Sequence, residues 1–360
     1  MRIGVPKEVK TLEGRVGLIP DAAAELIHQG HSVCIQSGAG ALSGYRDEDY
    51  RALGVDIKAD AASLYADAEM IVKVKEPIAE DLRHLEKRHL LFCYLHLAAV
   101  PELAKSLLDI GLTAVAFETV SEGGRLPLLA PMSDIAGRLS VQIGTHLLHQ
   151  PQGGKGVLLG GLPAAERGEV VILGAGMAGG AAATVAASLG ANVTVFAPNR
   201  DQLERMRALG PNVTALYPYR ESIYTAVKKA DLLVGAVLVT GERSPYLVTR
   251  NMVQEMQPGS VIVDISVDQG GCVETTRPTT YADPTYLDEG IVHFAVTNMP
   301  GAVPRTSSKA LSASLLPYVL RLAQKDWRQD AALQAGINVD DGELVHPGVR
   351  KSLPELCEPA

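Results

Sequence analysis

Cysteine is scarce in this 360-residue sequence, and its four copies are scattered without any C-x-x-C pair. That distribution argues against a zinc site and against a disulfide framework. Cys34 and Cys93 lie in apolar runs and are expected to be core thiols. Acidic residues outnumber basic ones, and the net charge of −8 gives no support for a nucleic-acid partner. The opening residues form no apolar signal segment, so we expect a reducing cytoplasm.

A continuous apolar segment of the kind that crosses a membrane is also missing. Residues 170–199 carry no charge, and a run of that length is able to span a bilayer. It breaks, however, into two apolar blocks, 170–173 and 193–196, with turn signals and a Gly- and Ala-rich middle between them. Two buried strands are the better interpretation, so no membrane partner is expected.

The first of these blocks runs into a glycine-rich turn and then into a helix of small residues. Gly174, Gly176 and Gly179 have the G-x-G-x-x-G spacing, with Met177 and Ala178 between the last two glycines. The first glycine makes the tight turn, the second lets backbone approach a pyrophosphate, and the third lets helix and strand pack closely. A strand before the motif and a helix after it are the context that favours dinucleotide binding.

Strand-like runs alternate with helical segments along most of the chain, which has the length of two domains. Strands are predicted at 3–5, 33–35, 71–75, 90–95 and 113–117, and again at 170–173, 193–196, 212–216, 232–234, 261–265 and 292–296. The alternation is typical of α/β domains with parallel sheets. An apolar helix after Pro304 is suited to return the chain to the first domain, and residues 340–343 predict a hairpin turn.

Motifs in several separated stretches carry a resemblance to a known family. They are Arg2–Glu8 with Arg15-Val16, Val72–Pro77, Tyr94-Leu95-His96, Met132-Ser133 with Ala136-Gly137-Arg138, the loop Pro151–Gly156, Val263–Ile265 with Asp268–Gly271, and Asn298–Thr306. Together they resemble the L-alanine dehydrogenase family, which is related to the soluble nucleotide-binding subunit of proton-translocating transhydrogenase.

The resemblance covers about residues 1–345 and carries specific expectations. It implies two Rossmann-like, doubly wound α/β domains with parallel sheets and the active site in a cleft between them. The catalytic domain would comprise residues 1–130 with 305–360, and the dinucleotide-binding domain residues 131–304. It also implies a homohexamer. The implied reaction converts L-alanine, water and oxidised nicotinamide cofactor reversibly into pyruvate, ammonium and reduced cofactor.

Four residues match the family's reactive positions. The resemblance gives Arg15 and Lys75 to the substrate carboxylate or carbonyl, His96 to acid/base chemistry, and Asp268 to water activation. A guanidinium fork suits a carboxylate, and a histidine suits proton exchange near neutral pH. Alternation along a strand places Lys73 and Lys75 on the same face, so the sequence alone does not rank them. Asp264 lies inside an apolar run and is expected to be structural.

Further positions match cofactor or pocket contacts in the family, namely Ser133, Val267, Asp268, Asn298 and Met299, and the resemblance also gives His96 and Asn298 contacts with the substrate. One position departs from the family. An acidic residue that binds the adenosine ribose is expected after the second nucleotide strand, and Ala197 stands there instead. With Asn199 and Arg200 close by, both NAD and NADP remain open as cofactors, as does a relative with another small amino acid.

Two other classes of function are alternatives. A soluble transhydrogenase subunit would bind no amino acid, and Arg15, Lys75 and His96 would then lack a joint purpose. A non-catalytic regulatory protein would not need all four reactive positions. Neither the sequence nor the resemblance indicates a metal site.

Overall fold

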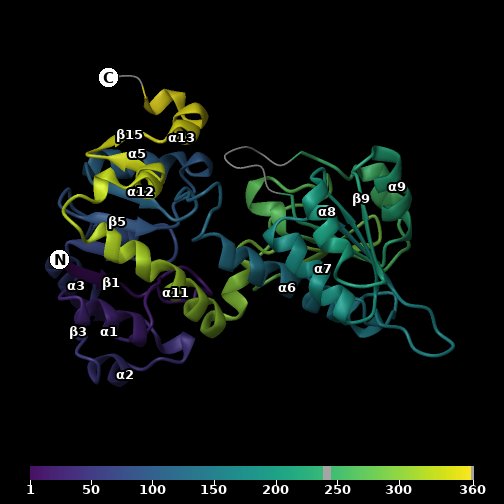
Figure 1. Cartoon of the computed structure of the whole chain (residues 1–360), viewed down its shortest axis with the longest axis horizontal. Helices are drawn as coiled ribbons and strands as arrows, with labels where there is room; N and C mark the ends of the chain where they lie inside the picture. Colours follow the sequence, from purple (N-terminus) through teal and green to yellow (C-terminus); the bar gives the residue numbers. More distant parts are fainter. Residues whose placement is uncertain (238–244, 358–360) are drawn as a thin grey trace. The chain divides into compact units, whose positions relative to one another are not determined.

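The computed structural model of the chain describes residues 1–237 and 245–357, without the side chains of Asp268 and Gln269. The chain divides into two compact units, Met1–Met132 with Val303–Ala360 and Ser133–Ala302 (Figure 1). Each unit is a largely parallel sheet flanked by helices, in agreement with the predicted α/β class.

The first unit is built on an eight-stranded sheet of the described residues, in the order β15-β14-β6-β5-β4-β1-β2-β3. Its strands are β1 Arg2–Val5, β2 Ser32–Gln36, β3 Asp56–Lys58, β4 Met70–Val72, β5 Leu90–Cys93, β6 Thr113–Ala116, β14 Ile337–Asp340 and β15 Glu343–Leu344. The first six are parallel, whereas β14 runs antiparallel to β6 and β15 antiparallel to β14, which confirms the predicted hairpin turn. Strands β5, β4 and β1 are neighbours in this order, so their carboxyl ends lie at the same edge of the sheet.

The helices of this unit begin and end at residues with suitable capping conformations. They are α1 Pro20–His28, α2 Asp47–Arg51, α3 Ala61–Asp67, α4 Ala79–Leu82, α5 Pro101–Ile110, α11 Pro304–Leu322, α12 Ala331–Gly336 and α13 Pro347–Ser352. Both α1 and α5 open on a proline, whose missing N–H costs nothing at the first helical position. Helix α5 is terminated by the following residue, Gly111, which adopts a left-handed φ of 79°. Helix α11 packs against α1.

The second unit has a seven-stranded sheet over its described residues, in the order β12-β13-β11-β10-β7-β8-β9. Its strands are β7 Glu169–Leu173, β8 Asn192–Phe196, β9 Val213–Leu216, β10 Leu232–Gly235, β11 Val261–Asp264, β12 Thr285–Asp288 and β13 Ile291–Phe294. Its helices are α7 Met177–Ser188, α8 Arg200–Arg207, α9 Arg220–Lys229 and α10 Arg250–Gln254. Helix α6 Ala130–Leu147 begins in the first unit and continues in the second. The strand order reverses between β7 and β10, which is the switch point where such sheets bind ligands.

The sequence prediction differs from the structure at β3, β4 and β12, and no strand is predicted at β3 Asp56–Lys58. β4 stops at Val72, because the N–H of Val74 donates to the Glu8 carboxylate (2.6 Å) and not to a neighbouring strand. β12 was not predicted, since its polar sequence Thr-Tyr-Leu-Asp shows no apolar run; it is held at the sheet edge by antiparallel pairing with β13.

Candidate active site

The first unit presents three of the predicted residues at one sheet edge. Arg15 lies in the segment between β1 and α1, Lys75 follows β4, and His96 follows β5. These three strands are neighbours, and all are parallel. Their exits form the edge where parallel sheets bind ligands.

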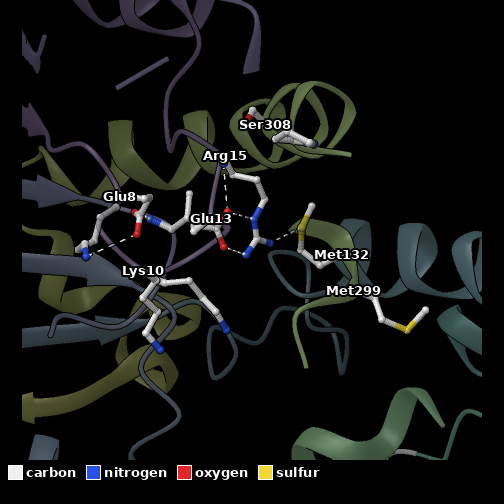
Figure 2. Close-up of polar contacts among 12 residues, drawn as sticks. Glu8, Lys10, Glu13, Arg15, Met132, Met299 and Ser308 are labelled. Carbon is white, nitrogen blue, oxygen red and sulfur yellow. Dashed lines mark hydrogen bonds and ion pairs between the residues drawn. The ribbon is translucent and has the colours of Figure 1, made fainter. Parts of the chain in front are cut away.

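Arg15 is buried, with only 3% of its side chain exposed. The Glu13 carboxylate binds the guanidinium bidentately (Figure 2). Arg15 Nε donates to Glu13 Oε1 at 2.7 Å, and Nη2 donates to Oε2 at 2.6 Å. The third nitrogen, Nη1, lies 3.2 Å from the Met132 sulfur. Burial alone would lower the pKa of Arg15, but the Glu13 carboxylate outweighs it and raises the pKa. The guanidinium is therefore charged and fixed in direction.

The structure separates the two lysines that the sequence leaves equivalent. Lys73 is 1% exposed and binds the Asp81 carboxylate at 2.8 Å, with Glu8 Oε2 at 3.5 Å. Lys75 keeps 15% of its side chain exposed, and its ammonium lies 3.8 Å from Glu76 Oε2. Lys73 is thus a buried structural cation, whereas Lys75 remains accessible.

His96 is held in an uncommon backbone conformation, with a left-handed φ of 50°, which a non-glycine residue adopts only when its surroundings impose it. The Glu118 carboxylate accepts the His96 N–H at 2.6 Å and lies 3.9 Å from Nδ1. The Tyr94 ring stacks against the imidazole with 5.8 Å between centroids. The side chain is 38% exposed, so the imidazole is oriented but reachable.

The supporting carboxylates were missed from the sequence. Glu13 stands two residues before Arg15 and was readable as a local partner. Glu8, Asp81 and Glu118 come from other segments and carry no local signal. Burial raises the pKa of Glu8, although Lys73 and the Val74 N–H oppose the increase.

The second unit shows why each glycine of the motif is a glycine. A Cβ on Gly174 would lie 2.4 Å from the Ala236 oxygen, and one on Gly179 would lie 1.9 Å from the Gly174 oxygen. Gly174 also has a φ of 101°. A Cβ on Gly176 would meet nothing within 4 Å. Packing thus requires the outer two glycines, whereas the backbone at Gly176, directly before α7, is open.

The other motif residues lie at the same end of the second sheet. Met177 and Ala178 form the first turn of α7, with Met177 55% exposed. Ala197 follows β8, is buried, and donates its N–H to Leu216 (3.1 Å). Asn199 caps α8 by accepting the Gln202 N–H at 3.0 Å, and Arg200 is exposed and paired with Glu204.

The remaining predicted residues follow β11 and β13 or begin α6. Val267 is buried in the short helix Ile265–Gln269, and Met299 is buried at the start of Met299–Ala302. Asn298 has a left-handed φ of 67°, and Ser133 is half-buried in α6. The side chain of Asp268 lies outside the described residues.

Asp264 is fully buried and accepts hydrogen bonds from the N–H groups of Ser266 and Cys272 at 3.0 and 2.9 Å, which is a structural role.

Within the described ranges, no group of His, Cys, Asp and Glu is arranged to hold a metal ion. No helix of residues 1–237 and 245–357 has the length and apolarity to cross a membrane.

Comparison with known proteins confirms the resemblance. Residues 4–136 match the alanine dehydrogenase/PNT N-terminal domain family, and residues 140–347 match its C-terminal domain family. The chain is 48% identical to alanine dehydrogenase of Halomonas elongata, covering 98% of this chain and 96% of that protein, and 48% identical to that of Bacillus subtilis, covering 100% and 97%. A solved L-alanine dehydrogenase structure, 50% identical, superposes with a TM-score of 0.95 over 99% of this chain and 100% of the other. A transhydrogenase from Sinorhizobium meliloti, 23% identical, shares the fold with a TM-score of 0.83 over 96% and 99%.

Proposed function

The chain belongs to the alanine dehydrogenase family, and from that membership we propose that it catalyses the reversible oxidative deamination of L-alanine to pyruvate and ammonium. The observation that carries the proposal is the buried, Glu13-anchored guanidinium of Arg15 at the strand edge that also bears Lys75 and His96. A nicotinamide cofactor accepts or returns the hydride when bound.

Arg15 and Lys75 are the groups suited to the substrate carboxylate and carbonyl. Glu13 and Met132 fix the direction of the Arg15 guanidinium, so the fork is oriented before substrate arrives. His96 is the group suited to exchange a proton with the substrate, because Tyr94 stacks on its ring and Glu118 holds its backbone while the ring stays accessible. Asp268 is proposed as the carboxylate that activates water.

Gly174, Gly176 and Gly179 would hold the pyrophosphate at the start of α7, with Met177 and Ala178 contributing N–H groups. Ser133, Val267, Asn298 and Met299 are proposed to contact the cofactor, and Asn298 the substrate as well.

A direct test follows the oxidation of reduced cofactor by the purified chain. We expect turnover only when pyruvate and ammonium are both present. Turnover independent of either one would contradict an amino-acid dehydrogenase and favour the transhydrogenase-type alternative. Assays with other small 2-oxo acids define the substrate range.

The cofactor is proposed to be NAD, with NADP accepted. Ala197 removes the charge that would repel a 2′-phosphate, and the exposed Arg200 is able to pair with one. We expect the NADH-to-NADPH ratio of kcat/KM to be small in this chain and to increase in Ala197→Asp. A hundredfold preference for NADH in the unmodified chain would refute NADP use.

We further infer from the resemblance a homohexamer located in the cytoplasm. Light scattering of the purified protein measures the first, and a mass other than six chains refutes it. Fractionation of the cells that make the protein measures the second.

A further inference from the structure

The carboxylate of Glu76 is shared by two lysines from different segments. Lys10, in the segment after β1, donates a hydrogen bond to Glu76 Oε1. Lys75, the preceding residue in the chain, has its ammonium 3.8 Å from Oε2. The distance to Lys75 exceeds that of a hydrogen bond, so the two lysines do not share the carboxylate equally.

The three side chains also differ in how far they are exposed to solvent. Glu76 is 13% exposed and Lys75 15%, whereas Lys10 is 32% exposed. Glu76 Oε2 is buried and accepts no hydrogen bond from the described residues. Among the same residues, the Lys75 ammonium donates no hydrogen bond. Burial opposes ionisation of Glu76, but Lys75 and Lys10 outweigh it and lower its pKa, so the carboxylate is charged at neutral pH.

We propose that Lys10 is a positioning residue that occupies Glu76 and so keeps the Lys75 ammonium available to the substrate. The inference rests on the proposed role of Lys75 in binding the substrate. Glu76 and the substrate offer Lys75 the same chemical group, a carboxylate. A direct pair between Lys75 and Glu76 would therefore compete with alanine or pyruvate.

Arg15 shows why this arrangement matters for a lysine. A guanidinium has five N–H donors in a rigid fork, so the bidentate pair with Glu13 engages only one edge of Arg15. An ammonium is a compact charge that one close carboxylate largely neutralises. Lys75 stays effective only while its neighbouring carboxylate is bound elsewhere, and Lys10 is the group that binds it.

Removing Lys10 should release Glu76 to Lys75. In Lys10→Met we expect the KM for pyruvate to increase about fivefold, equivalent to about 1 kcal/mol. The KM for reduced cofactor and the unfolding midpoint should not change. Lys10→Arg should restore the KM, because a guanidinium still donates to Glu76. Lys7→Met is the matched control: it removes the same charge from the same segment, where Lys7 forms no ion pair with the described residues.

A double-mutant cycle decides between competition and a simple loss of charge. In the Glu76→Gln background, Lys10→Met should leave the KM for pyruvate unchanged, since no carboxylate remains to be released. An equal increase in both backgrounds would overturn the proposal. So would an unchanged KM in Lys10→Met when Lys75→Met raises it. If Lys75→Met itself leaves the KM unchanged, the proposed substrate role of Lys75 fails instead.

Discussion

In the first unit, Arg15, Lys73 and Lys75 each lie beside a carboxylate, whereas the glycine turn of the second unit has open backbone at Gly176. A small carboxylic acid carries one negative charge, so its site needs cationic side chains whose orientation is fixed by neighbouring carboxylates. A dinucleotide offers a pyrophosphate, so its site needs space and N–H groups at a helix start. The first arrangement depends on partners from distant segments, and the second on one short turn.

The largest expected effect follows from breaking the buried charge group of the first unit. Lys73→Met leaves Glu8 and Asp81 buried without their cation, and loss of one partner of a buried pair costs about 3–5 kcal/mol. Trp327, the single tryptophan, belongs to the first unit, so its fluorescence reports denaturant unfolding there. An unchanged midpoint would show that the pairing does not stabilise this unit.

The same group predicts how stability depends on alkaline pH. Burial lowers the pKa of Lys73, but Glu8 and Asp81 outweigh it and raise the pKa. The native state then keeps a proton that the unfolded chain releases, so this contribution is complete below about pH 10.4, the usual lysine pKa, and declines as the pH rises further. Tryptophan-detected midpoints across that range should decline less in Lys73→Met. Parallel curves would contradict the assignment.

The second unit should respond to a single methyl group. Gly179→Ala puts a Cβ 1.9 Å from the Gly174 oxygen, and overpacking of this kind costs about 1–3 kcal/mol. Far-ultraviolet circular dichroism should reveal an earlier transition, while the Trp327 midpoint stays unchanged. A joint shift of both signals would show that the two units unfold together and would remove the basis for comparing them separately.

The glycine turn of the second unit was predictable because the residues that specify it are adjacent in the sequence. A branched apolar run, three spaced glycines and small residues specify β7, the turn and α7 without help from elsewhere. The strand exits that carry Arg15, Lys75 and His96 followed from apolar runs in the same way. Both cases rest on local patterns that the sequence displays directly.

The pairing in the first unit was not predictable for the corresponding reason. Alternation could not rank Lys73 and Lys75, since β4 ends at Val72 and the partners of Lys73 come from residues 8 and 81. The left-handed backbone of His96 depends on Glu118, which lies in another segment. Contacts between distant segments decide these features, and no local pattern encodes them.

Gly176 separates a glycine kept for a ligand from one kept for packing. Its φ is −70° and an added Cβ meets no atom within 4 Å, so Gly176→Val should unfold like the unmodified chain. If the space receives a pyrophosphate, the KM for reduced cofactor should increase at least about tenfold, or about 1.4 kcal/mol. The KM for pyruvate serves as the internal control. An unchanged cofactor KM would refute a pyrophosphate at this turn.

The smallest effects are expected at the start of α8, where Asn199 and Arg200 do different work. Asn199→Ala removes a helix cap and should cost about 1 kcal/mol of stability. Arg200→Ala breaks only an exposed pair with Glu204 and should leave the unfolding midpoint unchanged. A kinetic effect of Arg200→Ala therefore reports a ligand contact and not the fold. If Arg200 pairs with a 2′-phosphate, the KM for NADPH should increase while that for NADH does not, and equal changes for both cofactors would assign Arg200 no part in choosing between them.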